Sequence, residues 1–322
     1  MSGADRLVLI GQAAWVRSLA AGLTDAGLPV EAVPLQSVRD ALSVATWRRV
    51  ARSRVLVRVG FRPGARTWRG RVFDAALAAT KGRSTVACYW IGTDVLHLLE
   101  DVAAGARVAK WRSAAAVRHH LAGSEPLRRE LAHVGVDAAL VGFPWRTVDP
   151  PDVLPSMPPA VTVLTYVPDT RATFYGGPAL VEAARRLPQV RFLVMGGSGS
   201  WCDRHPSNVE FLGWVDDPAP LYAGSSAVVR VVDHDSIGGT AVEGLMFGRR
   251  VLYSQPLDHA VLVQRTADSL VEALQALVED HRAGRLVPDP AASRWARREF
   301  DHRRRFAQLA EHLGDLSGSK LR

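Results

Sequence analysis

The chain is poor in cysteine and has no long apolar run. Its 322 residues include only Cys88 and Cys202, a number and spacing that argue against a disulfide framework or a cysteine-based zinc site. No apolar segment approaches the roughly 20 residues that a membrane-spanning helix needs. The N-terminus leads from Asp5 directly into "RLVLIG", which is typical of a strand and not of a secretion signal. We therefore expect a cytoplasmic protein.

Positive charge is unevenly distributed along the chain. Residues 1–150 contain 21 Lys and Arg against 12 Asp and Glu, whereas residues 151–322 contain 19 against 20. The excess is greatest from Trp47 to Arg83, where eleven basic residues accompany one acid, Asp74. Such a field attracts an anionic membrane surface, a phosphorylated substrate or a polyanion. The alternative is a solvated surface in a chain whose arginines greatly outnumber its lysines.

Within that segment, arginines recur at helical spacing. Arg48 and Arg52 are one helical turn apart, as are Arg62 and Arg66, and tryptophans lie among them. This pattern suits the headgroup region of an anionic bilayer, so peripheral contact through Trp47–Arg83 at the inner face of the membrane is one expectation. The segment has no signature of a nucleic-acid-binding motif, and we expect no nucleic-acid partner.

Short β-branched runs alternate with helical patterns, which predicts βα units and parallel sheets. The predicted strands of the first half are "RLVLIG", "PVEAV", "RVLVRVG", "STVACYW", "VRHHLAG" and "AALVGF". Those of the second half are "AVTVLTYV", "VRFLVMG", "VEFLG", "AVVRVV" and "RVLYS". Helices are predicted between them, including Gly177–Leu187 and Ala241–Phe247. The fold class is α/β, with two doubly wound, Rossmann-like domains.

A proline-rich segment separates the two halves. "FPWRTVDPPDVLPSMPPAV" holds six prolines, which fix φ and remove backbone donors, so it is predicted to be an extended linker. The predicted organisation is a first domain at 1–152, a second at 153–290, a C-terminal helix at 291–313 packing back across the domains, and a disordered tail at 314–322.

The most informative stretch is "VVDHDSIGGTAVEGLMFGRRVLYS", residues 231–254. A strand-to-helix turn here carries Asp235 and paired glycines, and Glu243 follows one turn into the helix. Gly238 and Gly239 let backbone approach a ligand closely, and the unpaired N–H groups from about Thr240 favour a phosphate. Glu243 could accept hydrogen bonds from a ribose diol. In the alternative, Asp235 caps the turn and Glu243 only stabilises the helix.

This stretch resembles the nucleotide-sugar signature of retaining GT-B glycosyltransferases of the glycogen-synthase and bacterial mannosyltransferase group. The pattern reads Asp235, "SIGGTAV", Glu243-Gly244, "LMF", Gly248 and "RRVLYS". The resemblance covers essentially the whole chain and is strongest from Ala160 to Ser254. It implies two Rossmann-like domains whose parallel sheets face each other across a cleft.

The resemblance also implies functions for particular residues. Asp235 and Asp94 would be catalytic. The first domain would bind the acceptor through Gly11, Gln12 and Trp15. The nucleotide sugar would be bound by Glu243, Gly238, Gly239, Thr240, Arg171, Gly197, Gly213, Trp214 and Val215.

The implied reaction transfers a sugar from a nucleoside diphosphate with retention of anomeric configuration. It needs neither a metal nor another cofactor, because helix N-termini and Arg171 would stabilise the leaving diphosphate. The acceptor would be a glycan, a lipid-linked molecule or a small molecule. For Asp94, a purely structural place in the turn after Gly92-Thr93 is the alternative.

The sequence departs from the family pattern at four places. Asp235 stands where Glu is usual, and Tyr175-Gly176 where Lys-Gly is common. The glycine-rich loop after the first strand is reduced to "GQAAW", and Ile91-Gly92-Thr93-Asp94 replaces His-Gly-x-Asp. These departures leave open a degenerate relative that acts as a binding subunit. A nucleotide-sugar epimerase, an enzyme of another reaction type on the same fold, is a further alternative. A serine hydrolase is disfavoured, since "GGSGS" at 196–200 lacks the strand-turn-helix context of a nucleophile elbow.

Overall fold

The chain divides into two compact units. The computed structural model describes residues 6–35, 37, 39–40, 43–60, 68–80, 82–105, 117–145 and 148–318. The first unit comprises residues 1–146 and 302–322, and the second comprises residues 147–301. The division thus falls after residue 146, six residues before the boundary expected after residue 152.

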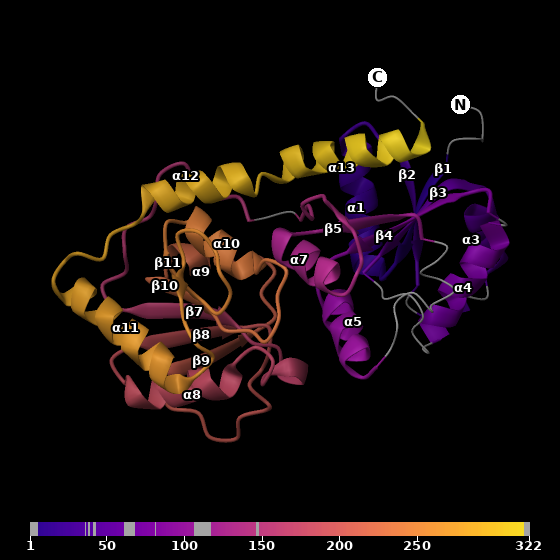
Figure 1. The fold of residues 1–322 in the computed structure, drawn as a ribbon. Coiled ribbons are helices and arrows are strands. Elements are labelled where there is room, and N and C mark those ends of the chain that lie inside the picture. The colour runs from indigo at the N-terminus through magenta and orange to yellow at the C-terminus, as the bar shows by residue number, and fades with distance from the viewer. Residues whose placement is uncertain are drawn as a thin grey trace. The chain divides into compact units, whose positions relative to one another are not determined.

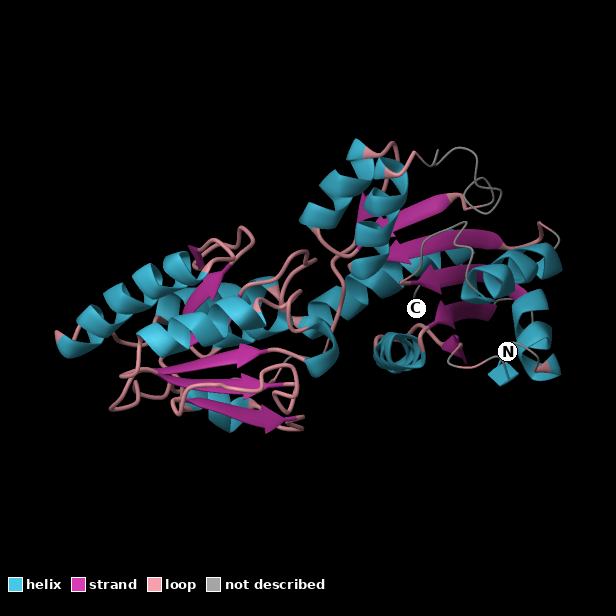
Figure 2. Cartoon of the chain, turned by 90° about the horizontal axis from the view of Figure 1, so that it is seen from below, coloured by secondary structure: helices cyan, strands magenta, loops and turns pink. Residues whose placement is uncertain are grey.

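The first unit contains a parallel six-stranded sheet in the order β2-β1-β3-β4-β5-β6, with helices on its faces (Figures 1 and 2). Its strands are β1 (Arg6–Gly11), β2 (Val30–Pro34), β3 (Ser53–Val59), β4 (Thr85–Trp90), β5 (His119–Ala122) and β6 (Ala139–Leu140). Its helices are α1 (Ala13–Asp25), α3 (Val44–Ala51), α4 (Trp68–Thr80), α5 (Thr93–Ala103), α7 (Glu125–His133) and α13 (His302–Ser317).

The second unit contains another parallel six-stranded sheet, in the order β12-β11-β10-β7-β8-β9. Its strands are β7 (Thr162–Tyr166), β8 (Arg191–Met195), β9 (Val209–Gly213), β10 (Ala227–Arg230), β11 (Arg250–Tyr253) and β12 (Val261–Leu262). Its helices are the 3₁₀ turn η2 (Asp169–Arg171), α8 (Gly177–Arg186), α9 (Ala219–Ala223), α10 (Gly239–Met246), α11 (Ala267–Arg282) and α12 (Pro290–Glu299).

All eleven predicted strands are present, and the α/β prediction is confirmed. β12, the edge strand Val261–Leu262, was not predicted from the sequence. Leu262 is 60% exposed there, so a two-residue strand with solvated side chains gives no burial pattern to detect.

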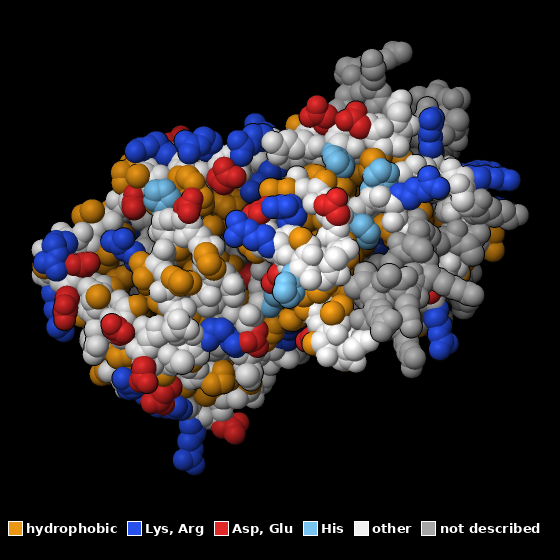
Figure 3. Space-filling model, viewed as in Figure 1, with side chains coloured by type: hydrophobic (Ala, Val, Ile, Leu, Met, Phe, Trp, Pro, Cys, Tyr) orange, Lys and Arg blue, Asp and Glu red, His pale blue; other side chains and the backbone are white. Residues whose placement is uncertain are grey.

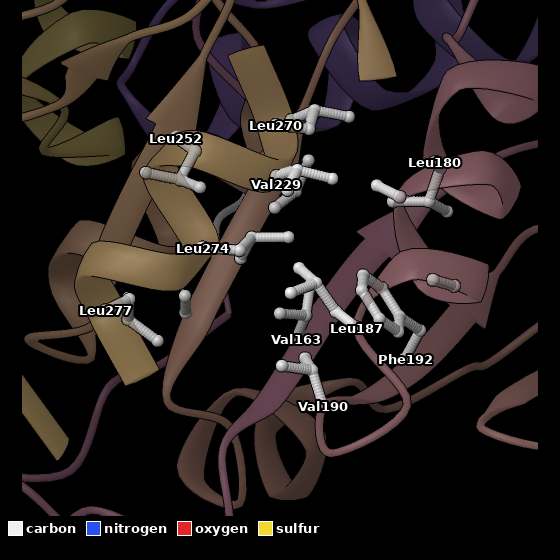
Figure 4. Close-up of a cluster of buried hydrophobic side chains, with 14 of the residues drawn as sticks. Val163, Leu180, Leu187, Val190, Phe192, Val229, Leu252, Leu270, Leu274 and Leu277 are labelled. Carbon is white, nitrogen blue, oxygen red and sulfur yellow. The ribbon is translucent and has the colours of Figure 1, made fainter. Parts of the chain in front are cut away.

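Apolar runs form strands here because both faces of each sheet are covered. Along β1, Val8 and Ile10 join one buried cluster while Leu7 and Leu9 join another, as the two-residue period of a strand requires. In the second unit, leucines of α8 and α11 pack on the face of the sheet that carries Val163, Phe192 and Val229 (Figure 4). On the opposite face, α10 lies so close that a Cβ at Gly244 would come within 2.7 Å of Val228.

The strand orders define where each unit can bind a ligand. In the second unit the chain proceeds from β7 to β8 on one side and later returns to β10 on the other side of β7. Loops after β7 and β10 therefore diverge at the carboxyl edge of the sheet, where open α/β sheets bind ligands. The corresponding switch point of the first unit lies between β1 and β3.

The C-terminal region differs from the prediction of one helix at 291–313 and a disordered tail from 314. It forms two helices, α12 and α13, which are interrupted at Phe300 and Asp301. α12 packs against α10 in the second unit, whereas α13 packs against α1 in the first. Residues 314–317 are helical, because Leu313 and Ser317 are buried against the first unit; residues 319–322 lie outside the described part.

The proline-rich segment has no helix or strand among its described residues, yet it is held in place. The buried guanidinium of Arg249 donates to the carbonyls of Pro155 (2.8 Å), Ser156 (3.3 Å) and Ala223 (3.0 Å). Arg297 of α12 donates to Pro151 O at 2.6 Å. Carbonyls that proline-rich backbone leaves without partners are thus bound by arginines from the folded unit.

Arg249 should therefore be important for stability. We expect Arg249→Met to lower the free energy of unfolding by about 1–3 kcal/mol, since three backbone carbonyls lose a charged donor. Arg250→Met is the matched control, because Arg250 is exposed on the adjacent position. Urea unfolding followed by circular dichroism measures both. Equal losses of the free energy of unfolding in the two variants would contradict the stabilising role of the Arg249 hydrogen bonds.

Candidate functional site

The candidate site lies at the carboxyl edge of the second sheet, where two loops meet. Asp233 N–H, after β10, donates to Phe174 O, after β7, at 3.0 Å. Arg265 donates to the Asp233 carboxylate and also to Thr173 O, at 3.1 Å. These bonds connect the two loops that flank the switch point. Sequence analysis missed Arg265, which is 32 residues from its acidic partner.

The N-terminus of α10 opens into this edge. Gly238 precedes the helix, and a Cβ there would meet Arg230 Nε at 2.1 Å, so only glycine fits. Gly238 N–H donates to Tyr253 Oη at 3.0 Å. The N–H groups of Gly239 and Thr240 begin the helix, where no intrahelical acceptor exists, and its first turn contains no acid. The helix start is therefore suited to an anion.

Asp235 does not cap the helix. Its Oδ2 accepts hydrogen bonds from Arg230 Nε at 2.6 Å and from Tyr253 Oη at 2.9 Å. Arg230 and Asp235 side chains are only 11% and 13% exposed, and Arg230 Nη1 also donates to Thr240 Oγ1 at 3.3 Å. Burial and then the nearby Asp235 carboxylate raise the pKa of Tyr253, which stays a neutral donor. Arg230 and Tyr253 escaped sequence analysis because they lie in strands that read as apolar.

Glu243 lies in the second turn of α10, largely buried. Its Oε2 accepts a short bond from Tyr222 Oη (2.6 Å), and its Oε1 accepts one from Val148 N–H (3.3 Å). Burial raises the pKa of Glu243, and the bond from Tyr222 opposes that rise. Each oxygen keeps a lone pair for another donor. The carboxylate is thus oriented by side-chain and backbone donors outside its own helix.

Arg171 ends the 3₁₀ turn after β7. Its guanidinium carbon lies 3.8 Å from the Phe174 ring centroid and 5.9 Å from that of Tyr175. Within the described part of the chain, no acid pairs with it. Its charge is therefore available to a ligand.

Gly197 follows β8 and lies against the loop after β7. A Cβ at Gly197 would be 2.8 Å from Asp169 Oδ1. The Asp169 carboxylate accepts the backbone N–H bonds of Ser198, Gly199 and Ser200, and these bonds, led by that of Ser198, lower the pKa of Asp169. Asp169, which sequence analysis did not select, thus fixes the loop that contains Gly197.

Gly213 ends β9 beside that loop, and Trp214 and Val215 follow it. Gly213 has φ of 66°, which favours glycine, and its N–H donates to Gly197 O at 3.1 Å. The Trp214 ring is 74% exposed, and its Nε1 donates to Asp216 at 2.9 Å. Val215 is half-buried. The structure therefore brings Gly197 and Gly213 together and leaves a flat aromatic surface beside them.

In the first unit, Gly11, Gln12 and Trp15 lie at its switch point. A Cβ at Gly11 would be 2.6 Å from Val59 O, so the end of β1 presses on the end of β3. Gln12 is exposed at the start of α1, where its side chain makes no capping bond. Trp15 is 41% exposed and packs edge-on against Phe143, with ring centroids 5.4 Å apart.

Asp94 has a structural place in the same unit. Its buried carboxylate accepts the N–H groups of Gly92 (2.7 Å) and Ile91 (3.1 and 3.2 Å) at the start of α5. Gly92 has φ of 151° and ψ of −98°, a conformation that requires glycine. Burial raises the pKa of Asp94, although those backbone bonds oppose the rise. Hydrogen bonds within this turn therefore occupy both carboxylate oxygens of Asp94.

The basic segment Trp47–Arg83 is described only in part. Arg48 and Arg52 are exposed at the end of α3, and Trp68 is 37% exposed. Arg62 and Arg66 lie outside the described residues. By contrast, the visible face of the second unit mixes acidic and basic side chains (Figure 3).

The described residues provide neither a membrane-spanning helix nor a metal site. No helix in the described ranges is long and apolar enough to cross a membrane. In those same ranges, His, Cys, Asp and Glu side chains form no group of three or more that could hold a metal ion.

The raised pKa of Glu243 predicts a pH-dependent contribution to stability. The unfolded carboxyl ionises near its usual value of 4.5, so above that pH the folded state binds more protons than the unfolded state. The associated stability is complete below pH 4.5 and is lost as the pH rises through the raised folded pKa. Relative to the wild type, Glu243→Gln should therefore gain free energy of unfolding from pH 4.5 to neutral pH.

Urea unfolding at the two pH values measures this difference. Glu272→Gln, an exposed position on α11, is the matched control and should show no such trend. A Glu243→Gln variant whose relative stability does not change with pH would contradict the buried, raised-pKa assignment.

Sequence comparison identifies one partial relative. No family model matches the chain. A stretch of 76 residues is 37% identical to a curated protein of Methanosarcina acetivorans described as an uncharacterized glycosyltransferase. The match covers 23% of this chain and 19% of that protein, so it spans about a fifth of the relative's length.

Solved structures resemble the chain over nearly its whole length. Anabaena HepE in complex with UDP-glucose aligns with a TM-score of 0.68 at 14% identity, covering 96% of this chain and 99% of its own. Sucrose-phosphate synthase from Thermosynechococcus elongatus aligns at 0.65 and 14% identity, covering 97% and 98%. A glycosyltransferase from Rickettsia africae aligns at 0.63 and 12% identity, covering 97% and 99%. These likenesses establish the fold: the chain has the two-domain α/β architecture of the GT-B type.

Proposed function

We propose that the protein is a glycosyltransferase that takes its donor sugar from a nucleoside diphosphate. One observation carries the proposal: a glycine-bounded helix start without an acid in its first turn lies between two oriented carboxylates, Asp235 and Glu243. A diphosphate needs the helix start without an acid. A sugar nucleotide needs that helix start and the two carboxylates. The fold and the partial relative support the same activity, and HepE was solved with UDP-glucose.

In this proposal each donor group has a stated partner. The N–H groups of Gly239 and Thr240 and the guanidinium of Arg171 bind the diphosphate. Glu243, oriented by Tyr222, accepts hydrogen bonds from ribose hydroxyls. The exposed face of Trp214, with Gly213 and Val215 beside it, packs against the base. Gly197 allows backbone to approach this end of the ligand.

The transfer breaks the bond between the anomeric carbon and the diphosphate oxygen and forms a bond from that carbon to an acceptor hydroxyl. The helix start and Arg171 stabilise the negative charge that develops on the leaving diphosphate, so we propose a metal-independent reaction. Retention of the anomeric configuration and transfer of a hexose are the finer parts of the proposal. They rest on the family resemblance of the Asp235–Glu243 stretch, in which Asp235 faces the sugar.

For the acceptor we propose the first unit. Gly11, Gln12 and Trp15 at its switch point would contact the acceptor, and Asp94 would lie among them on the acceptor side. The net positive charge of residues 1–150 favours an anionic or lipid-linked acceptor. Peripheral association with the inner face of the membrane through Trp47–Arg83, from a cytoplasmic protein, belongs to the same proposal.

A thermal-shift panel tests the donor. UDP, GDP, ADP, CDP, dTDP and their common sugar conjugates are added to wild type and to Glu243→Ala. A ligand at 100 times its Kd adds about 2.7 kcal/mol, which raises Tm by roughly 5–10 °C, since 1 kcal/mol corresponds to about 2–4 °C in a unit of this size. We expect one base to give this shift in wild type and not in the variant.

Glu272→Ala on the exposed face of α11 is the control and should respond as wild type does. If no nucleotide shifts wild type, the donor site is refuted and a degenerate binding subunit becomes the better account. For the nucleotide sugar that binds, incubation without acceptor separates a transferase from an epimerase, since only the epimerase yields an isomer.

A further inference from the structure

Arg230 occupies an unusual place for an arginine. It is the last residue of β10, after Ala227, Val228 and Val229, which are fully buried. Its own side chain is 11% exposed. Taking a guanidinium out of water costs free energy unless a partner of opposite charge compensates it. Nε and Nη1 have partners, whereas Nη2 has none among the described residues. A buried cation thus keeps unused donors at the edge of the sheet.

The free donors lie at the helix start described above. Gly238, whose missing side chain makes room for Arg230, immediately precedes α10, and Arg230 Nη1 donates to Thr240 in its first turn. A guanidinium and the positive end of a helix dipole therefore converge on one point. Together they favour an anion with several oxygens, which the planar fork of arginine can bind through two N–H groups.

A second arginine approaches the same place from the other loop. The Arg230 guanidinium carbon lies 5.5 Å from the centroid of the Tyr175 ring, and that of Arg171 lies 5.9 Å from the same centroid. Two cations, one after β7 and one at the end of β10, thus share one aromatic ring at the switch point. Only one of them, Arg230, has a carboxylate partner among the described residues.

Asp235 holds that guanidinium in place. Arg230 and Tyr253 both donate to Oδ2, so Oδ1 has no partner in the described part of the chain. The carboxylate fixes the orientation of Arg230 without occupying Nη2. It also compensates the buried charge when no ligand is bound.

We propose that Arg230 is a diphosphate-binding residue of the donor site and that Asp235 is its internal counterion. This inference rests on the proposed function, and it assigns to Asp235 a positioning role that sequence analysis did not consider. The ligand chemistry is the diphosphate of a nucleotide. The alternative is a purely structural ion pair, whose loss would change stability and leave the contribution of the phosphates to affinity unchanged.

The test compares nucleoside diphosphates with their nucleosides. Binding of UDP, GDP, ADP, CDP and dTDP is measured by calorimetry, and binding of the five nucleosides by NMR titration. The proteins are wild type, Arg230→Met/Asp235→Asn, Asp235→Asn and Arg250→Met. The double variant removes both charges together and so leaves no unpaired buried charge. Arg250→Met is the control for loss of an exposed arginine in the same unit.

For the base that binds wild type, the double variant should weaken the diphosphate by about tenfold or more, as loss of a charged hydrogen bond implies. Its affinity for the nucleoside should stay within about twofold. Asp235→Asn should bind the diphosphate at least as tightly as wild type, since Arg230 is kept and a negative charge is removed. Arg250→Met should match wild type. If the double variant does not fold, Arg230→Lys replaces it and should weaken only the diphosphate, because the fork is lost.

Three results would overturn the inference. If the diphosphate binds wild type and the double variant equally, Arg230 is structural and the proposed donor site stands without it. If the nucleoside is weakened as much as the diphosphate, the site has been distorted and the phosphate assignment fails. If no diphosphate binds wild type, the proposed function fails and the inference fails with it.

Discussion

The structure of the second unit depends on one topological constraint. Since β10 returns to the side of β7 opposite β8, the two following loops must diverge at the carboxyl edge of the sheet. The backbone N–H and C=O groups of these loops cannot form the hydrogen bonds that pair neighbouring strands. Hydrogen bonds from Asp233 and Arg265 therefore join the loops, and the residues selected on chemical grounds, Asp235 and Glu243, extend from the same turn and helix.

The two carboxylates of this turn are stabilised in different ways. Asp235 is paired with the guanidinium of Arg230, with Nε and Oδ2 2.6 Å apart. Glu243 has no cation in direct contact among the described residues and relies on Tyr222 and a backbone amide. An ion pair therefore holds the Asp235 carboxylate, whereas hydrogen bonds alone hold that of Glu243.

The sheets could be predicted well from the sequence, and so could part of the local backbone at the candidate site. Strands such as β1 and β7 were predictable because their apolar runs are buried on both faces. The turn at Asp235–Thr240 was predictable because paired glycines before a helix are a local signal. The partners Arg230, Tyr253 and Arg265 were not, since tertiary contacts alone decide which distant side chain reaches an acid. The break at Phe300 also lacks any glycine or proline to mark it.

The assignment of α13 to the first unit has a consequence for biosynthesis. Phe306, Leu309 and Leu313 belong to a core cluster whose other members include strand residues of β1, β3 and β4. The ribosome makes those strands first, but this face of their sheet is completed only after the whole second unit has been translated. The apolar surface that α13 covers therefore stays exposed until translation ends. Loss of the last twenty or so residues would uncover the core of the unit whose strands were synthesised first.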